Sequence, residues 1–484
     1  MNNINVKLLI PVICLFMLCH GASAYSPSTP GAPILNAPAI ENGSITPDKR
    51  AASQSMTSQM MLVPDNYKET ADGLDDAPSI QRAVNAACAG SIRNLVFHAH
   101  RYKIASPITQ NCLANWEGQG YDEQAGFNYA APGTWFDIGT NFSGTLTSPI
   151  NIVAGAGSVF ENFGIAEPSQ PAPPGANYDP SFPADSAKPH ILSYTPNKWS
   201  PAPFYFVFSV TGSPGNLFRH IMLDGINQGF HVDHSGRTNF EDIRGQVFNT
   251  MFEIHESYDV SRITDVHNWP YWSSADPVLA YDQEHAYVIA SYRNDTPFWD
   301  NIFGFGVRAV LYLADDVDGT TTGIQAGKIS CDSAVYCIRA NTNAPVQVTG
   351  QFASIRTFGS KWSTTYPTSL VQYPGSSMLQ LDSSAVLQIG SMENFGTDVA
   401  TVIFTAPKSP SNLMVGSLFV HADSMSSNSF IAKFPTTNAS IPSLLTISMT
   451  PAIAGTVAGF RNSNTPPNGS GVGVYQYNTA TGFH

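Results

Sequence analysis

Three stretches of this chain repeat the same pair of short strands in the same phase. In each, an apolar residue is followed eleven residues later by another, at Ile221 and Val232, Ile243 and Ile254, and Ile302 and Leu313. Apolar and polar side chains alternate around the second member, as they do in a strand with one buried face. Because no helical segment separates the repeats, their size indicates a stacked solenoid of strands, and we predict an all-β parallel β-helix.

The spacing of later fragments extends this solenoid. Phe230 and Phe252 are 22 residues apart, and Leu311 follows 59 residues later, which we interpret as two coils. The 43 residues between Tyr336 and Leu379 have the length of about two coils as well. Outward side chains of equal phase then lie above one another at about 4.8 Å.

The N-terminal segment of the chain indicates export. Residues 1–24 contain an apolar run too short to span a bilayer, followed by a small-residue cleavage pattern at Ala22-Ser23-Ala24, which predicts a signal peptide and a secreted or periplasmic protein without membrane insertion. We expect a flexible leader over 25–60 and the β-helix over 61–434. Loop insertions are expected near 165–200 and 264–285, and a C-terminal cap or tail over 435–484.

Charge and cysteine content limit the partners. The net charge of −13 opposes binding to phosphate backbones, so nucleic acid is not an expected partner. No nucleotide or redox fingerprint is present, and no cofactor is expected. Four cysteines follow the signal peptide, and the local pairing joins Cys88 to Cys112 and Cys331 to Cys337, with buried free thiols as the alternative. No Cys/His spacing indicates a zinc site, so no metal is expected.

A helix precedes the solenoid. Asp76 is a candidate cap, Pro78 suits the first turn, Ile80 and Val84 belong to one apolar face, and Gly90 ends the helix.

The segment Asp72-Gly73-Leu74-Asp75-Asp76, followed by Ile80-Gln81-Arg82-Ala83, resembles the opening of the pectate lyase superfamily. Arg101-Tyr102-Lys103-Ile104 and the glycine turn at 116–120 resemble the segments that come next in that family. The resemblance implies a right-handed parallel β-helix whose open N-terminal end is capped by the helix. It also implies glycan chemistry without selecting the reaction, since the superfamily contains hydrolases, lyases and epimerases.

Four outward residues form the catalytic candidate. The coil alignment places His231 over Glu253 and Asp233 over His255. Glycoside hydrolysis needs two carboxylates, and Asp233 and Glu253 on neighbouring coils would be roughly 5–9 Å apart. The alternative is a solvated ladder of charges without function.

An insertion after Ile263 carries the binding candidates. Trp269, Tyr271 and Trp272 follow Asp265 and His267, and aromatic rings exposed on a loop suit stacking on sugars. The alternative is that Trp269 and Trp272 fold back into a local core.

Cations and a short acidic segment lie nearby in the sequence. We include Arg244, Arg262, Tyr292 and Arg293 as further substrate-binding candidates, because an acidic glycan would need them; solvated or ion-paired arginines are the alternative. Residues 315–319 resemble a fragment of a calcium loop but are interpreted first as a turn.

These features predict an exported enzyme that cleaves a polysaccharide or oligosaccharide, by hydrolysis ahead of elimination. A polysaccharide lyase on the same scaffold and a non-catalytic glycan-binding solenoid remain alternatives. A homotrimer is left open.

Overall fold

The computed structural model describes residues 61–123, 132–172, 199–343, 347–358, 376–396, 400–404, 411–421, 430–433, 444–447, 452–454 and 475–477. The chain divides into two units, residues 1–56 and 57–484, and every described residue belongs to the second. The predicted signal peptide, the leader and most of the insertion near 165–200 lie outside the described residues.

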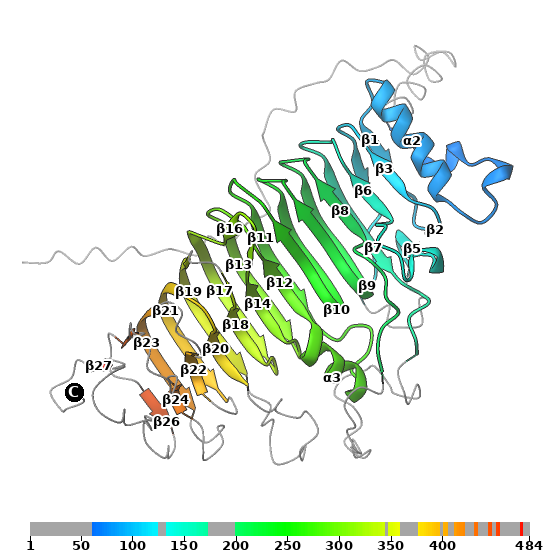
Figure 1. The fold of residues 1–484 in the computed structure, drawn as a ribbon. Helices are drawn as coiled ribbons and strands as arrows, with labels where there is room; N and C mark the ends of the chain where they lie inside the picture. Colours follow the sequence, from blue (N-terminus) through cyan, green and yellow to red (C-terminus); the bar gives the residue numbers. More distant parts are fainter. Residues whose placement is uncertain are drawn as a thin grey trace, which may run out of the picture. The chain divides into compact units, whose positions relative to one another are not determined.

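The described chain coils into three parallel ladders of strands (Figure 1). The first ladder holds β1 (Asn94–Val96), β4 (Asn115–Glu117), β7 (Val159–Ala166), β9 (Leu217–Asp233), β10 (Asn239–His255), β11 (Arg262–Asn268), β13 (Phe298–Phe305), β17 (Ile324–Asp332), β19 (Val348–Phe358), β21 (Ala385–Phe395) and β23 (Asn412–His421). The second ladder begins with β2 (Arg101–Ile104) and β5 (Trp135–Ile138), and continues through the later part of β7 and of the long strands that follow it.

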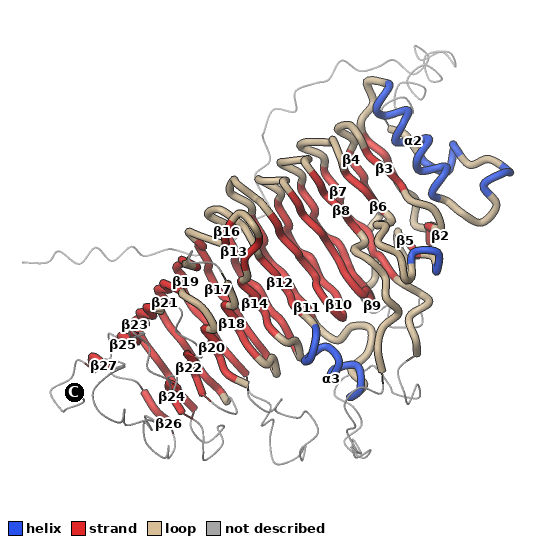
Figure 2. Tube along the Cα trace, viewed as in Figure 1, coloured by secondary structure: helices blue, strands red, loops and turns tan. Residues whose placement is uncertain are grey.

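The third ladder contains β3 (Ile108–Gln110), β6 (Ile150–Ile152), β8 (Phe208–Thr211), the ends of β9 and β10, β12 (Tyr287–Ser291), β14 (Ala309–Leu313), β18 (Tyr336–Ala340), β20 (Ser377–Leu381), β22 (Ala400–Phe404) and β24 (Phe430–Lys433). Figure 2 shows that strands form most of each coil. The predicted all-β, right-handed parallel β-helix with an N-terminal capping helix is confirmed.

Stacked aromatic rings fill the interior. Phe252 lies opposite Phe230 in the strand register, as the 22-residue spacing predicted, and their ring centroids are 5.4 Å apart. Phe208 continues this stack at 5.0 Å from Phe230. The centroid spacing is close to the distance between neighbouring strands, so rings of equal phase stack from coil to coil.

A sharp corner joins the first ladder to the second. The corner residue has a positive φ in five successive coils, at Asn162, His220, Asp242, Asp265 and Asn301. Left-handed backbone at a non-glycine residue is uncommon, and Asn, Asp and His are the residues enriched there. The corner thus lines up five polar side chains along the coil axis, and the last four of them form part of the candidate site described below.

The helix α2 (Ala77–Ala89) covers the N-terminal end of the coils, and Cys88 is joined to Cys112 by a disulfide. The predicted cap is wrong in detail. Asp76 does not cap the helix, because its carboxylate accepts from Lys103 N at 2.7 Å and from Lys68. Asp75 Oδ1 instead accepts the backbone N–H of Ala77 at 3.0 Å.

Two other expectations are corrected. Ile338 lies directly opposite Leu379, so the stretch between β18 and β20 is one coil with an insertion and not two coils. The insertion after β11 contains a helix, α3 (Asp276–His285), that the sequence did not indicate. In contrast, the 59 residues from Phe252 to Leu311 do form two coils, through Ile289.

Further strands occur within residues 435–484, the segment expected to be a cap or tail. β25 (Leu444–Ile447) and β26 (Ala452–Ala454) pair with β23, and β27 (Tyr475–Tyr477) pairs with β25. A second disulfide joins Cys331 to Cys337, as the local pairing predicted, and both residues are buried. Two disulfides suit an oxidising compartment.

Candidate functional site

The third ladder brings the four catalytic candidates onto one outward face. His231 pairs with Glu253 and Asp233 pairs with His255 in the register of β9 and β10, so the predicted alignment of the coils is confirmed. The intervening Val232 is buried, which turns its neighbours outward.

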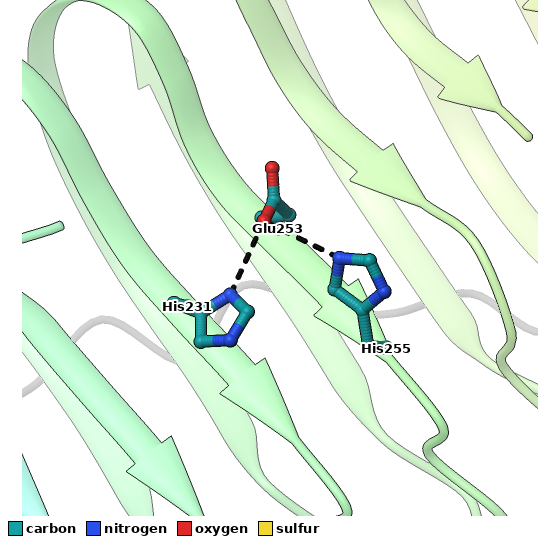
Figure 3. A group of neighbouring side chains, drawn as sticks. All are labelled: His231, Glu253 and His255. Atoms are coloured by element: carbon teal, nitrogen blue, oxygen red, sulfur yellow. Dashed lines mark hydrogen bonds and ion pairs between the residues drawn. The ribbon is translucent and has the colours of Figure 1, made fainter. Parts of the chain in front are cut away.

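His231, Glu253 and His255 form what we name the His–Glu cluster (Figure 3). One carboxylate oxygen of Glu253, Oε1, lies 3.2 Å from Nδ1 of His231 and 3.3 Å from Nε2 of His255. The other oxygen points away from both rings (Figure 3). The three side chains keep 20%, 21% and 26% of their surface exposed, so the cluster is accessible from solvent.

The two imidazoles set the charge of Glu253. Burial favours the neutral carboxyl, but the hydrogen bonds from His231 and His255 outweigh it and lower the pKa of Glu253 to about 2. Burial opposes the charged form of His255, but the bond to Glu253 outweighs that effect and raises the pKa of His255 above its usual value. Glu253 is therefore a carboxylate at neutral pH and does not serve as a proton donor.

Aromatic rings flank the cluster at both ends. Tyr292, one of the predicted binding residues, stacks on His255 with ring centroids 4.2 Å apart. Phe206 lies 5.3 Å and Tyr205 lies 6.4 Å from His231, measured between centroids. The sequence analysis missed Tyr205 and Phe206, because their approach to His231 depends on the packing of one coil on the next.

Asp233 is engaged by a residue that the sequence analysis also missed. Nδ1 of His234 lies 2.8 Å from Oδ1 of Asp233, and the other ring nitrogen contacts Glu256. The hydrogen bond to Asp233 raises the pKa of His234. His234 has a positive φ of 50°, which turns its ring back over the preceding residue.

Asp316 approaches the His–Glu cluster from a later coil. It belongs to an antiparallel pair, β15 (Asp315–Asp316) and β16 (Gly319–Thr320), so the interpretation of this segment as a turn agrees with the structure. Oδ2 of Asp316 lies 3.7 Å from Nδ1 of His255, and among the described residues it has no hydrogen-bond partner.

A groove of about 650 Å³ runs along the corner between the first and second ladders. We name it the corner groove, and its lining includes Asp242, Arg244, Asp265, His267, Phe303 and Lys328. Three of these residues are predicted binding candidates, at Arg244, Asp265 and His267. The row of left-handed corner residues supplies one wall, and the outward residues of the second ladder supply the other.

The aromatic loop reaches this groove and not the His–Glu cluster. Nδ1 of His267 lies 2.7 Å from the hydroxyl of Tyr271, and the ring of Trp269 stacks 5.8 Å from that of His267. Burial, together with the charge of Arg244, lowers the pKa of His267, while burial raises the pKa of Tyr271 to about 12. At neutral pH the pair is therefore a neutral imidazole and a protonated phenol.

The prediction that Trp272 holds a sugar is wrong. Trp272 is 1% exposed and packs against Phe248 and Trp199, so the alternative of a local core holds for this residue. Its ring also lies over Gly225, where a Cβ atom would come within 2.4 Å of it. The neighbouring backbone is secured by Gln246, whose Oε1 accepts from the Trp272 and Ser273 amides.

The arginines predicted to bind substrate lie in different parts of the structure. Arg244 bonds Asp242 at 2.6 Å and contacts Glu123, both at the corner groove. Arg262 is an exposed residue at the start of β11 and does not line the groove. Arg293 lies 3.1 Å from Asp295, away from the groove lining. Arg244, Asp265 and His267 thus lie at the corner groove, whereas Tyr292 lies with the catalytic candidates on the third ladder.

No helix among the described residues has the length and apolar character needed to cross a membrane.

The course of the chain is that of a parallel β-helix protein. No protein-family profile matches the sequence, and no curated protein matches it either. Similar solved structures include the A-module of mannuronan C-5 epimerase AlgE4 from Azotobacter vinelandii, at 13% identity and a TM-score of 0.48 over 83% of this chain and 100% of that chain. A double mutant of the tailspike of E. coli bacteriophage HK620 has 9% identity and a TM-score of 0.43, over 83% of this chain and 65% of the tailspike. A mutant DFA-IIIase from Arthrobacter chlorophenolicus A6 has 10% identity and a TM-score of 0.42, over 84% and 87% of the two chains.

Proposed function

We propose that this chain is an exported polysaccharide-processing enzyme of the pectate lyase superfamily that cleaves an acidic glycan by elimination in the corner groove. The observation that carries the proposal is the 2.7 Å contact between Tyr271 and His267, a residue that lines the same groove as Arg244 and Lys328. This proposal places the alternative reaction of the sequence analysis ahead of hydrolysis.

Elimination needs a base, an acid and a cation, and the groove together with the adjoining aromatic loop has a residue for each. The base removes the proton next to the carboxylate of a uronate, the bond to the leaving oxygen breaks, and a double bond forms between the two carbons. His267 is neutral and suits the base. Tyr271 keeps its proton and suits the acid that protonates the leaving oxygen. Their hydrogen bond offers a path by which the proton returns to Tyr271 after each turnover.

The cation must stabilise the negative charge that develops on the uronate. Lys328 is exposed in the groove, and its ammonium has no ion-pair partner among the described residues. Arg244 is already paired with Asp242 and Glu123, and its remaining part in this proposal is to lower the pKa of the base. Lys328 is therefore the proposed partner of the substrate carboxylate.

Hydrolysis by Asp233 and Glu253 remains a second candidate, because the two residues occupy neighbouring coils on an accessible face. This reaction needs one carboxyl group that stays protonated. Glu253 does not meet this need. The carboxyl groups of Glu167, Asp224 and Asp282 have pKa values raised by burial, but all three are buried and cannot reach a glycan.

The test uses the exported protein against a panel of acidic and neutral polysaccharides, with ultraviolet absorbance and reducing ends followed together. Elimination forms a conjugated double bond, so both signals rise in step on acidic glycans. Reducing ends without absorbance would overturn elimination and support the hydrolase. Binding without any product would support the non-catalytic glycan-binding solenoid.

Variants test which residues carry out the proposed elimination. Tyr271→Phe removes the proposed acid and leaves the ring in place, so we expect kcat to fall by about 10²- to 10⁴-fold. Tyr258→Phe is the matched control, because it removes a tyrosine hydroxyl outside the groove. A variant Tyr271→Phe with full activity would contradict the assignment. The homotrimer also stays a proposal, which light scattering of the secreted protein tests.

A further inference from the structure

The distances inside the His–Glu cluster lie between those of the close and the long histidine–carboxylate contacts of the described residues. The long contacts join His421 to Glu393 at 3.6 Å and His285 to Glu284 at 3.7 Å. The rings of His98, His220 and His234 lie 2.6, 2.7 and 2.8 Å from the carboxylate oxygens of Asp65, Asp242 and Asp233. A charge-assisted hydrogen bond of this type is expected at about 2.7–2.9 Å. In the His–Glu cluster the two separations are 3.2 and 3.3 Å.

These longer separations match a different geometry. Zn²⁺ binds imidazole nitrogen and carboxylate oxygen at about 2.0–2.2 Å in a tetrahedron, which puts neighbouring ligand atoms about 3.3–3.6 Å apart. The ring nitrogens of His231 and His255 and one oxygen of Glu253 all lie within 4.8 Å of one another. Oε1 of Glu253 is therefore separated from each ring nitrogen by close to the edge length of such a tetrahedron.

The surroundings of His255 fit the same geometry. A histidine that binds a metal through one ring nitrogen usually donates from the other to a carboxylate, which fixes the ring and its tautomer. Nε2 of His255 faces Glu253, and Nδ1 faces Oδ2 of Asp316 at 3.7 Å. That carboxylate oxygen has no hydrogen-bond partner among the described residues, so it is available for this contact.

We propose that His231, Glu253 and His255 bind a divalent transition-metal ion of the Zn²⁺ type, with Asp316 as the carboxylate that positions His255. The site is distinct from the proposed elimination site, since it lies on the third ladder and not in the corner groove, and it does not rest on that function. Three protein ligands leave one position of the tetrahedron for water or a ligand. The partial exposure of all three side chains leaves that position open to solvent.

No spacing along the sequence indicates this site, because its ligands come from two coils. His231 lies on β9, whereas Glu253 and His255 are alternate residues of β10, and only the coil register brings them together. Imidazole ligands favour ions such as Zn²⁺ over Ca²⁺ and Mg²⁺, which prefer oxygen ligands.

The experiment uses tag-free full-length protein stripped with a chelator and then incubated with Zn²⁺ or Co²⁺. We expect one Zn²⁺ per chain after desalting, measured by mass spectrometry of the metal, and the visible absorption of tetrahedral Co²⁺. Excess Ca²⁺ or Mg²⁺ should not displace the ion. Failure of the parent protein to retain Zn²⁺ or to give the Co²⁺ spectrum would overturn the proposal, and this result needs no variant.

Variants then assign the ligands. Asp316→Asn should weaken Zn²⁺ binding by about 10- to 100-fold and keep the tetrahedral Co²⁺ spectrum, because it disturbs only the positioning of His255. His255→Ala and Glu253→Gln should each cost more than that and alter the spectrum. His98→Ala is the matched control, since it removes a histidine paired with a carboxylate elsewhere. Equal losses in His98→Ala and His255→Ala would also overturn the site. Unchanged Zn²⁺ binding in His255→Ala and in Glu253→Gln would likewise overturn the site.

Discussion

Nδ1 of His267 lies 2.7 Å from the hydroxyl oxygen of Tyr271, so a residue on β11 and a residue on the loop after it form one proton-sharing pair. The pair lies beside Arg244, whose positive charge disfavours a second positive charge on the imidazole. A base of this kind stays neutral at a lower pH than an exposed histidine does.

The first prediction concerns the pH dependence of cleavage. Burial and Arg244 lower the pKa of His267, so kcat/KM should fall as the pH drops through a value below the ordinary 6.5. Arg244→Gln removes the neighbouring charge and should move this acidic limb to higher pH. Arg293→Gln, away from the groove, should leave the limb in place. Equal limbs in the parent and in Arg244→Gln would contradict the role of His267.

The second prediction concerns Asp224, a buried carboxyl group with no hydrogen-bond partner among the described residues. Burial raises its pKa to about 8 from an ordinary 3.8. Between these values the unfolded chain loses the proton and the folded chain keeps it, so the free energy of unfolding should fall as the pH rises and level off above about 8. Asp224→Asn removes this titration and should reduce the slope, leaving the contribution of buried groups such as Glu167 and Asp282, as measured by urea unfolding between about pH 5 and pH 9. The exposed Asp259→Asn should not reduce the slope. A parent profile as flat as that of Asp224→Asn would refute the prediction.

The third prediction separates the two tryptophans of the aromatic loop. Trp272→Ala should lower the free energy of unfolding by about 3–5 kcal/mol, because it opens a cavity between Phe248 and Trp199. Trp269 is half-buried beside the groove, so Trp269→Ala should cost less stability and should mainly weaken binding of the glycan. Chemical unfolding and calorimetric binding together check both statements. A larger loss of stability in Trp269→Ala would count against this division.

The fourth prediction is an energetic coupling between Gly225 and Trp272. A Cβ atom at Gly225 would lie 2.4 Å from the Trp272 ring, and its φ of +65° adds about 1–2 kcal/mol for an alanine. Gly225→Ala should therefore destabilise the parent protein strongly. In the Trp272→Ala background the clash is gone, and only the backbone cost should remain. A double-mutant cycle measures the difference, and strictly additive effects would argue against the contact.

The coil register could be predicted from the sequence because it depends on local alternation. Phe230 and Phe252 share a phase, and a slip of one residue would turn every buried ring outward. The same alternation predicts that His231 lies beside Glu253, as the strand register shows. The 43 residues from Tyr336 to Leu379 were misjudged because an insertion of about one coil length cannot be told from a coil by spacing alone.

The distribution of the candidates over two faces could not be predicted. The packing partners of a loop determine which ladder it contacts. For Trp272 these partners are Phe248 and Trp199, which are distant from it in sequence. The helix α3 was missed because Asp276–His285 has no continuous apolar face. Asp316 was interpreted only as part of a turn, since its approach to His255 crosses coils.

Because each coil contacts only its neighbours, the protein is modular along its length. The coil that contains β10 contributes Arg244 to one proposed site and Glu253 to the other. Deleting this coil would therefore remove a residue from each of the two proposed sites. The coils after β18 supply none of the groove-lining residues named here and none of the cluster. They lengthen the solenoid beyond both proposed sites by about 4.8 Å for each coil.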